Sequence, residues 1–157
     1  MKKITPFLWF DSDAEEAMKF YAGIFPDAKI GPVKYYPEGG PMPAGSVMWV
    51  GFELAGQQFY AMNAGPHFRF NEAVSFYVSC ADQKEVDYYW DKLTSDGGME
   101  QPCGWLKDRF GLSWQIIPDQ LEQLMGSSDP ATAQRVMAAM MKMKKIIVAD
   151  LEAAARG

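Results

Sequence analysis

Histidine and cysteine are scarce in this chain of 157 residues. His67 is the single histidine, and Cys80 and Cys103 are the two cysteines. A histidine-rich metal centre is therefore excluded, and a catalytic triad that needs histidine could use only His67. The two cysteines could pair, but the sequence is typical of a cytoplasmic protein, in which thiols stay reduced.

Long apolar runs and long basic runs are lacking too. No run approaches the roughly 18–20 apolar residues that span a bilayer, and Asp11 comes too early for the apolar part of a signal peptide. The formal net charge is −5, and the densest basic group, at residues 142–145, is soon followed by acidic residues. We therefore expect a cytoplasmic protein with no nucleic-acid partner and no membrane partner.

Aromatic residues and methionine are abundant instead, with 10 Phe, 7 Tyr, 5 Trp and 11 Met. Their rings and thioethers supply much apolar volume, and the chain is long enough to bury one core. We expect a single domain that spans residues 1–157.

The first half of the chain predicts a strand, a helix and three more strands. Residues 4–10 form an apolar run that favours a buried strand. Residues 11–13 offer side-chain oxygens that cap the helix after it, and Pro26 ends that helix. A metal site at these acidic residues is the alternative to capping. The further strands are expected at residues 29–36, 46–54 and 57–63.

The second half repeats this order. A shift of about 69 positions places Phe7 on Phe76 and Asp13 on Asp82, which favours an internal duplication over a chance likeness of two strand–helix units. The expected fold class is therefore α+β, with two βαβββ modules that form curled mixed sheets. The modules are expected at residues 1–64 and 73–117, and a C-terminal helical extension at residues 118–156.

Within this extension, Asp129 and Pro130 are typical of a helix start. The helical face could cover the core of its own subunit, or it could be a subunit interface, since methionine adapts to irregular surfaces. A long terminal helix added to a complete fold favours dimerisation slightly. The apolar face consists of Ala133, Val136, Met137, Met140, Met141, Ile147, Val148 and Leu151.

Several stretches resemble a known family. TPFLWFD at residues 5–11, FNEAVSF at residues 70–76, CGWLKDRFGLSWQI at residues 103–116 and RVMAAM at residues 135–140 are similar to PhnB-like proteins. These belong to the vicinal-oxygen-chelate superfamily, with glyoxalase I, extradiol dioxygenases and bleomycin-resistance proteins. The family often carries the label 3-demethylubiquinone-9 3-methyltransferase. The resemblance implies paired βαβββ modules around a cavity, and a homodimer.

The metalloenzymes of this superfamily hold a divalent metal with His or Glu on the first and last strand of each module, which stabilises an enediolate-like charge. At the corresponding positions this chain offers none of the usual metal ligands. We therefore expect no cofactor, although a divalent metal held by non-standard groups is the alternative. The positions concerned are Thr5 or Pro6, then Gln58, Tyr60 or Met62, then Ala73 or Val74, and finally Gln115.

The methyltransferase label is disfavoured as an activity. A donor that carries adenosine usually sits on a glycine-rich strand-to-helix turn, and the pairs at residues 39–40 and 97–98 lack that context. His67, a general-base candidate, is more simply explained as a solvated loop residue. Cys103, a candidate nucleophile if Lys107 lowered its pKa, is more simply a packed thiol.

The aromatic residues on the strands give the leading interpretation. Their rings either line a ligand pocket or fill it as core. A metal-independent protein that binds an aromatic or apolar small molecule is favoured, with a lyase or isomerase of the same superfamily as the alternative and a purely structural protein third. Whether the chain is an enzyme stays open. The expected ligand-binding residues are Trp9, Trp49, Tyr60, Asn63, Trp105, Trp114 and Gln115.

Overall fold

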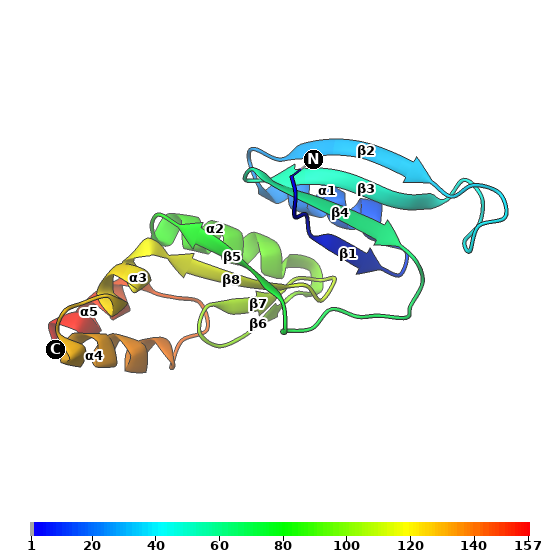
Figure 1. Cartoon of the computed structure of the whole chain (residues 1–157). Coiled ribbons are helices and arrows are strands. Elements are labelled where there is room, and N and C mark those ends of the chain that lie inside the picture. The colour runs from blue at the N-terminus through cyan, green and yellow to red at the C-terminus, as the bar shows by residue number, and fades with distance from the viewer. Residues whose placement is uncertain (1) are drawn as a thin grey trace. The chain divides into compact units, whose positions relative to one another are not determined.

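We describe a computed structural model of the chain that covers residues 2–157 (Figure 1). The chain divides into two compact units, Met1–Arg69 and Phe70–Gly157. Each unit contains one four-stranded mixed sheet with a helix packed on it. The α+β fold with two βαβββ modules and C-terminal helices is therefore confirmed. Within residues 2–157, no helix has the length and apolar character needed to cross a membrane.

The N-terminal unit contains a sheet with the strand order β1-β4-β3-β2. β1 runs parallel to β4, and the other neighbours are antiparallel. α1 lies against one face of this sheet (Figure 1). The elements are β1 (Phe7–Phe10), α1 (Ala14–Ile24), β2 (Lys29–Tyr35), β3 (Val47–Leu54) and β4 (Gln57–Asn63).

The alternation in β3 determines which face of this sheet is buried. Val50, Phe52 and Leu54 are at most 3% exposed, and Tyr21 of α1 stacks on Phe52 with ring centroids 6.2 Å apart. The side chains in between, from Val47 to Glu53, point to the face without a helix, because successive residues of a strand alternate between faces. The predicted division of this strand into two faces is confirmed.

The start of α1 differs from the prediction. Asp13 is the N-cap residue, but its side chain makes no capping hydrogen bond. Instead the backbone N–H of Ala14 donates to Oδ1 of Asn63, at the end of β4, at 2.8 Å. A polar side chain distant in sequence satisfies the free helix N–H as well as a local cap does.

The C-terminal unit contains a sheet with the strand order β5-β8-β7-β6, in which β5 runs parallel to β8. α2 packs on the face that carries Leu106, Trp114 and Ile116, all nearly fully buried. The elements are β5 (Ser75–Cys80), α2 (Gln83–Thr94), a 3-10 turn η1 (Ser95–Gly97), β6 (Met99–Glu100), β7 (Trp105–Lys107), β8 (Ser113–Pro118), α3 (Asp119–Met125), α4 (Pro130–Met140) and α5 (Val148–Arg156).

The predicted shift of 69 positions superposes the helices α1 and α2, whereas the strands β1 and β5 need a shift of 70. Tyr21 and Trp90 are buried at equivalent helix positions. Phe7, however, is 54% exposed on the face without a helix, whereas Phe76 pairs with the buried Trp114. The link from strand to helix is one residue shorter in the second module, and a shift of one residue moves a side chain to the opposite face.

From Asp129 on, the C-terminal extension forms two helices, α4 and α5, instead of one continuous helix. Residues 141–147 form a turn between α4 and α5. Val136, Ile146 and Leu151 are fully buried, and with Leu121 they pack on Ile117 of β8. This part of the apolar face therefore covers the core of its own unit, while Met137 and Met141 remain exposed.

Candidate functional site

The face of the N-terminal sheet opposite α1 carries a row of aromatic side chains, which we call the aromatic face. Phe7 lies beside Tyr60, and the next row along the strands contains Trp9, Met62 and Trp49. All five alternate with the buried residues that contact α1. This face therefore carries several large apolar side chains that are not covered by α1.

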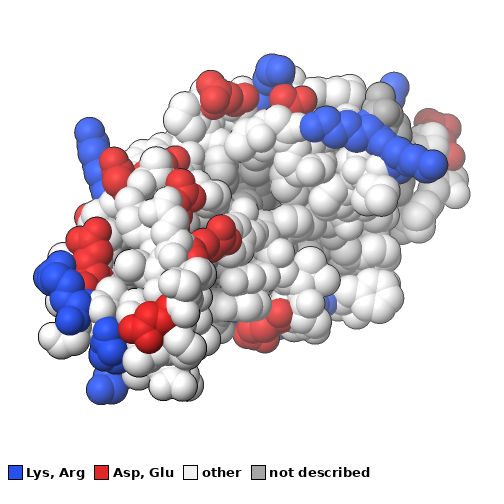
Figure 2. All heavy atoms as spheres, turned by 60° about the vertical axis from the view of Figure 1, so that its left-hand side comes forward, with Lys and Arg blue, Asp and Glu red and all other residues white. Residues whose placement is uncertain are grey.

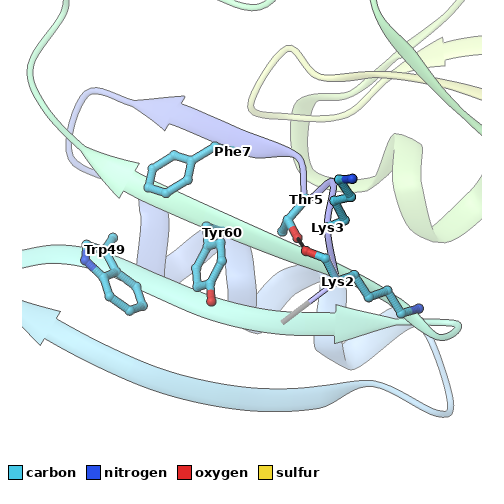
Figure 3. Close-up of a pocket in the computed structure, with 6 residues that line it drawn as sticks. All are labelled: Lys2, Lys3, Thr5, Phe7, Trp49 and Tyr60. Carbon is cyan, nitrogen blue, oxygen red and sulfur yellow. Dashed lines mark hydrogen bonds between the residues drawn. The ribbon is translucent and has the colours of Figure 1, made fainter.

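A cavity of about 400 Å³ lies on the aromatic face (Figure 3). The Tyr60 ring lies next to both other rings of the lining. The Tyr60 centroid is 5.5 Å from the Phe7 centroid and 5.1 Å from the Trp49 centroid, and the Tyr60 and Trp49 rings meet edge-on. The volume falls in the range of small-molecule sites. Its lining residues are Lys2, Lys3, Thr5, Phe7, Trp49 and Tyr60.

Glycine makes room for the central ring. A Cβ at Gly51 would lie 3.1 Å from Cε1 of Tyr60, so a larger residue there would push the ring away. A second cavity of about 150 Å³ is lined by Gly51, Glu53 and Gln58 together with residues of β2. The amide nitrogen of Gln58 donates to the Tyr60 hydroxyl at 3.4 Å. Both cavities therefore lie next to Tyr60.

The charges around the cavity are mostly positive. The Lys2 ammonium donates to the carbonyl of Gly56, and Lys3 also lines the cavity. Glu53, on the same face, forms an ion pair with Lys29 at 3.2 Å. Elsewhere Lys and Arg lie in small groups beside Asp and Glu, as the visible face in Figure 2 shows. No extended basic surface is visible on this face.

Trp9 and His67 form a separate group. The Trp9 indole donates to the Gly65 carbonyl at 2.9 Å, and its ring meets Phe68 edge-on at 4.9 Å. His67 is exposed, with its ring 6.4 Å from that of Trp9, and it does not line the cavity. No Ser, Cys or carboxylate side chain is hydrogen-bonded to it in the described residues, so the structure offers no triad around it.

Two predicted ligand residues lie away from any open face. Asn63 is 8% exposed and caps α1, and its Nδ2 donates to the Val47 carbonyl at 3.3 Å. Trp114 is 3% exposed beneath α2, and its indole donates to Asp108 at 2.9 Å. Both stand on the helix-covered side of their strands. Neither residue lines the cavity on the aromatic face.

Asp108 explains why residues 103–116 form such a recognisable stretch. Its carboxylate is buried and accepts hydrogen bonds from the Trp114 indole and from the backbone N–H groups of Phe110 and Leu112. These bonds hold the turn between β7 and β8 in place.

Trp105 and Gln115 lie side by side on the face of the C-terminal sheet opposite α2. The amide nitrogen of Gln115 donates to the Ser75 hydroxyl at 2.9 Å. Nearby, the Lys107 ammonium pairs with Glu72, and this hydrogen bond is the main cause that lowers the pKa of the Glu72 carboxyl. Both predicted residues are half-buried and accessible from this face.

The two cysteines are free. Cys80 is buried in the C-terminal unit, and burial is the main cause that raises the pKa of its thiol to about 12. Cys103 has a positive φ of 62°, and its backbone N–H donates to the Met143 carbonyl at 2.9 Å. Cys103 therefore lies in a turn whose backbone is hydrogen-bonded to the C-terminal extension. Lys107, the predicted activating group, pairs with Glu72 instead.

The metal of the superfamily does not fit this donor set. Thr5 and Tyr60 do meet at the cavity, as the resemblance implies, and Gln58 lies next to it. These positions supply hydroxyl and amide groups instead of the imidazole, carboxylate or thiolate that divalent transition metals prefer. Within residues 2–157, no three His, Cys, Asp or Glu side chains are grouped to hold a metal ion.

The repeated element order and the topology of the two sheets define the class of protein. Paired βαβββ modules are the vicinal-oxygen-chelate fold, and structural comparison agrees. A fosfomycin resistance protein, FosX, from Listeria monocytogenes, solved with Mn(II) and a sulfate ion, is 18% identical. Its TM-score is 0.51, and the alignment covers 73% of this chain and 90% of that one. At this identity the likeness shows the fold alone.

The chain belongs to the 3-demethylubiquinone-9 3-methyltransferase (PhnB-like) family, whose model matches residues 2–117. A PhnB protein from Bacillus cereus with the same methyltransferase name is 36% identical, with a TM-score of 0.67 over 74% of this chain and 99% of that one. A Pseudomonas aeruginosa protein of known structure is 19% identical, with a TM-score of 0.61 over 75% and 98%. No functionally curated protein matches the chain significantly.

Sequence reasoning missed three of the residues that line the cavity. Phe7 belongs to an apolar run that predicts a buried strand, and only its spacing of two from Trp9 indicates the accessible face. Lys2 and Lys3 precede the strand and carry no motif. Their position depends on β1 lying next to β4, which places the N-terminal segment across the aromatic face.

Proposed function

We propose that this chain is a small-molecule binding protein, with a planar aromatic ligand held on the aromatic face of the N-terminal sheet. The observation that carries the proposal is the cavity of about 400 Å³ walled by Phe7, Trp49 and Tyr60. Offset or edge-to-face contacts with a flat ring add about 0.5–1.5 kcal/mol per pair beyond the burial of area. The two units act as one vicinal-oxygen-chelate domain in the cytoplasm.

The proposal treats the protein as independent of a metal. Its support is the donor set at the cavity, where hydroxyl and amide groups replace the standard ligands. The alternative is a lyase or isomerase with a metal held by non-standard groups. Elemental analysis of protein purified without added metal separates the two. Stoichiometric Zn, Ni, Mn or Fe, together with loss of ligand binding on chelation, would contradict the proposal.

Ligand binding is tested by titrating the protein with a panel of aromatic and quinone-like compounds while tryptophan fluorescence is recorded. At least one compound should bind, and Trp49→Ala and Tyr60→Ala should each weaken it by about tenfold, the equivalent of 1.4 kcal/mol. Tyr35→Ala is the matched control, because Tyr35 is an exposed ring in the same unit that does not line the cavity. Equal affinity in all three variants would contradict the site.

We also propose that the protein is a homodimer through the exposed part of α4. Support comes from Met137 of α4 and from Met141, the residue that caps the C-terminal end of α4. Both remain exposed although Val136 is buried. Replacing both methionines with serine leaves the buried cluster intact and should produce monomers in sedimentation velocity. A dimer that persists in this variant would contradict the role of α4.

A further inference from the structure

The cavity on the aromatic face combines apolar walls with positive charge, although the whole chain has a net charge of −5. Lys2 and Lys3 line it at the end where the N-terminal segment crosses the sheet, as Figure 3 shows. Lys34 lies beside Trp49 in the strand register, at the other end of the aromatic row. Cations therefore flank the rings on both sides.

Negative charge near the rings is compensated. Glu53 is the acidic residue that the strand register places on this face, and its carboxylate forms an ion pair with Lys29 at 3.2 Å. Lys29 belongs to the smaller cavity and takes no part in the larger one. Glu53 is thus already paired, and the lining of the larger cavity contains two lysines and no acidic residue.

Of the two lysines in the lining, Lys3 is the one whose ammonium is not engaged with Gly56. The ammonium of Lys2 already donates to the Gly56 carbonyl. The backbone N–H of Lys2 donates to Oε1 of Gln58 at 3.4 Å. These bonds fix the N-terminal segment across the sheet next to Thr5, whose hydroxyl donates to the Lys2 carbonyl at 3.3 Å. Lys3 follows directly in this fixed segment and lines the cavity.

We propose that the ligand is an aromatic anion, most simply a planar aromatic carboxylate. Its ring lies against Trp49 and Tyr60, and its negative group lies at the Lys3 ammonium. Aromatic walls by themselves attract cations over the ring faces, but two lysines in the lining repel a cationic ligand. This inference rests on the proposed function, because it names the chemical class of ligand for the same cavity.

The test uses three probes that share one ring system: 2-naphthoate, neutral 2-naphthalenemethanol and cationic 2-naphthylmethylammonium. Isothermal titration of the full chain at low salt should give the order naphthoate, then the alcohol, then the ammonium compound. One exposed charge pair corresponds to roughly a two- to fivefold difference in affinity. The advantage of naphthoate over the alcohol should fall to nearly nothing at about 1 M salt, where the Debye length is about 3 Å.

Variants of Lys3 test whether this residue causes the tighter binding of naphthoate. Lys3→Gln should remove most of the preference for naphthoate over the neutral alcohol, and Lys3→Arg should keep the preference. Lys142→Gln, at an exposed lysine of the other unit, is the matched control for net charge. Loss of alcohol binding in Lys3→Gln would show that the residue shapes the cavity, and would overturn the inference.

The remaining outcomes separate the inference from the proposed function. Equal affinity for all three probes, or tightest binding of the ammonium compound, would overturn the anion and leave an aromatic-binding cavity. A preference for naphthoate that survives Lys3→Gln would overturn the role of Lys3. If none of the three probes binds, both the inference and the proposed function of the cavity are contradicted.

Discussion

The side-chain amide of Gln83, in the first turn of α2, accepts a hydrogen bond from the backbone N–H of Val148 at 2.7 Å. Its amide nitrogen donates to the carbonyl of Ile146 at 3.0 Å. The Gln83 side chain thus bonds the backbone on both sides of Ile147, the residue that precedes α5. Because the family model ends at residue 117, these bonds join the family fold to the segment that follows it.

We expect Gln83→Ala to loosen this segment. The two backbone groups at residues 146 and 148 would lose their partner, which costs about 1–3 kcal/mol when such groups are partly buried. Urea unfolding should show the loss, and hydrogen exchange should accelerate at the Val148 amide. Gln134→Ala, at an exposed glutamine of α4, should change stability by less than about 0.5 kcal/mol. Unchanged exchange at Val148 would contradict this role.

Leu151 tests whether the extension is part of the core. It is fully buried with Val136 and Ile146, so Leu151→Ala should lower the free energy of unfolding by about 2–5 kcal/mol. Met99→Ala is the control, because Met99 is 59% exposed in the same unit and its removal should cost less than about 0.5 kcal/mol. Similar, small effects in both variants would mean that the extension docks weakly.

Two glycines offer a matched pair. Gly104 and Gly111 both have positive φ values, of 82° and 87°, so alanine strains the backbone at both. A Cβ at Gly104 would also lie 2.8 Å from Cδ1 of Ile117, whereas none of the surrounding atoms lies within 4 Å at Gly111. Gly104→Ala should therefore cost about 1–3 kcal/mol more than Gly111→Ala. Thermal unfolding of both variants measures this difference, and equal costs would contradict the close packing.

Alkaline pH should destabilise the C-terminal unit. Burial raises the pKa of the Cys80 thiol from 9.0 to about 12, and burial together with Glu122 raises the pKa of Tyr77. Between pH 9 and 12 the unfolded chain releases the Cys80 proton and the folded chain keeps it, so stability falls as the pH rises through this window. Below pH 9 both states are protonated, and Cys80 gives no pH dependence.

The check is the free energy of unfolding in urea between pH 7.5 and 10.5. Cys80→Ala should flatten the alkaline decline, and Cys103→Ala should keep the slope of the unchanged protein. Identical slopes in all three proteins would show that the buried thiol does not control this pH dependence.

The secondary structure follows from local patterns. The alternation in residues 47–54 and the tight turn expected at Ala55 and Gly56 predict β3 and β4, and both strands are present. The positive φ at Ala55 and Gly56 is typical of a two-residue hairpin turn. Helix positions such as Tyr21 and Trp90 follow from apolar spacing in the same way. These features depend on neighbouring residues only, so the sequence contains them in full.

The site depends on contacts between distant residues, and here prediction was partial. Trp49 and Tyr60 were predicted and do line the cavity. Asn63 and Trp114 have the right chemistry for a ligand site, but they point to the helix-covered sides of their strands, where they bond to Ala14 and Asp108. A ring or an amide looks the same in a sequence whichever face it occupies.

By itself the sequence determined the class of fold, the family and the scarcity of metal ligands, because these depend on composition, order and local spacing. The tertiary structure decided which face of β1 stays free, since that follows from the register of Phe7 with Tyr60. It also decided where the lysines lie and where the C-terminal extension packs. The physical reason is that the register of a strand with its neighbours, and the helix that packs on the sheet, decide which of its two faces is buried.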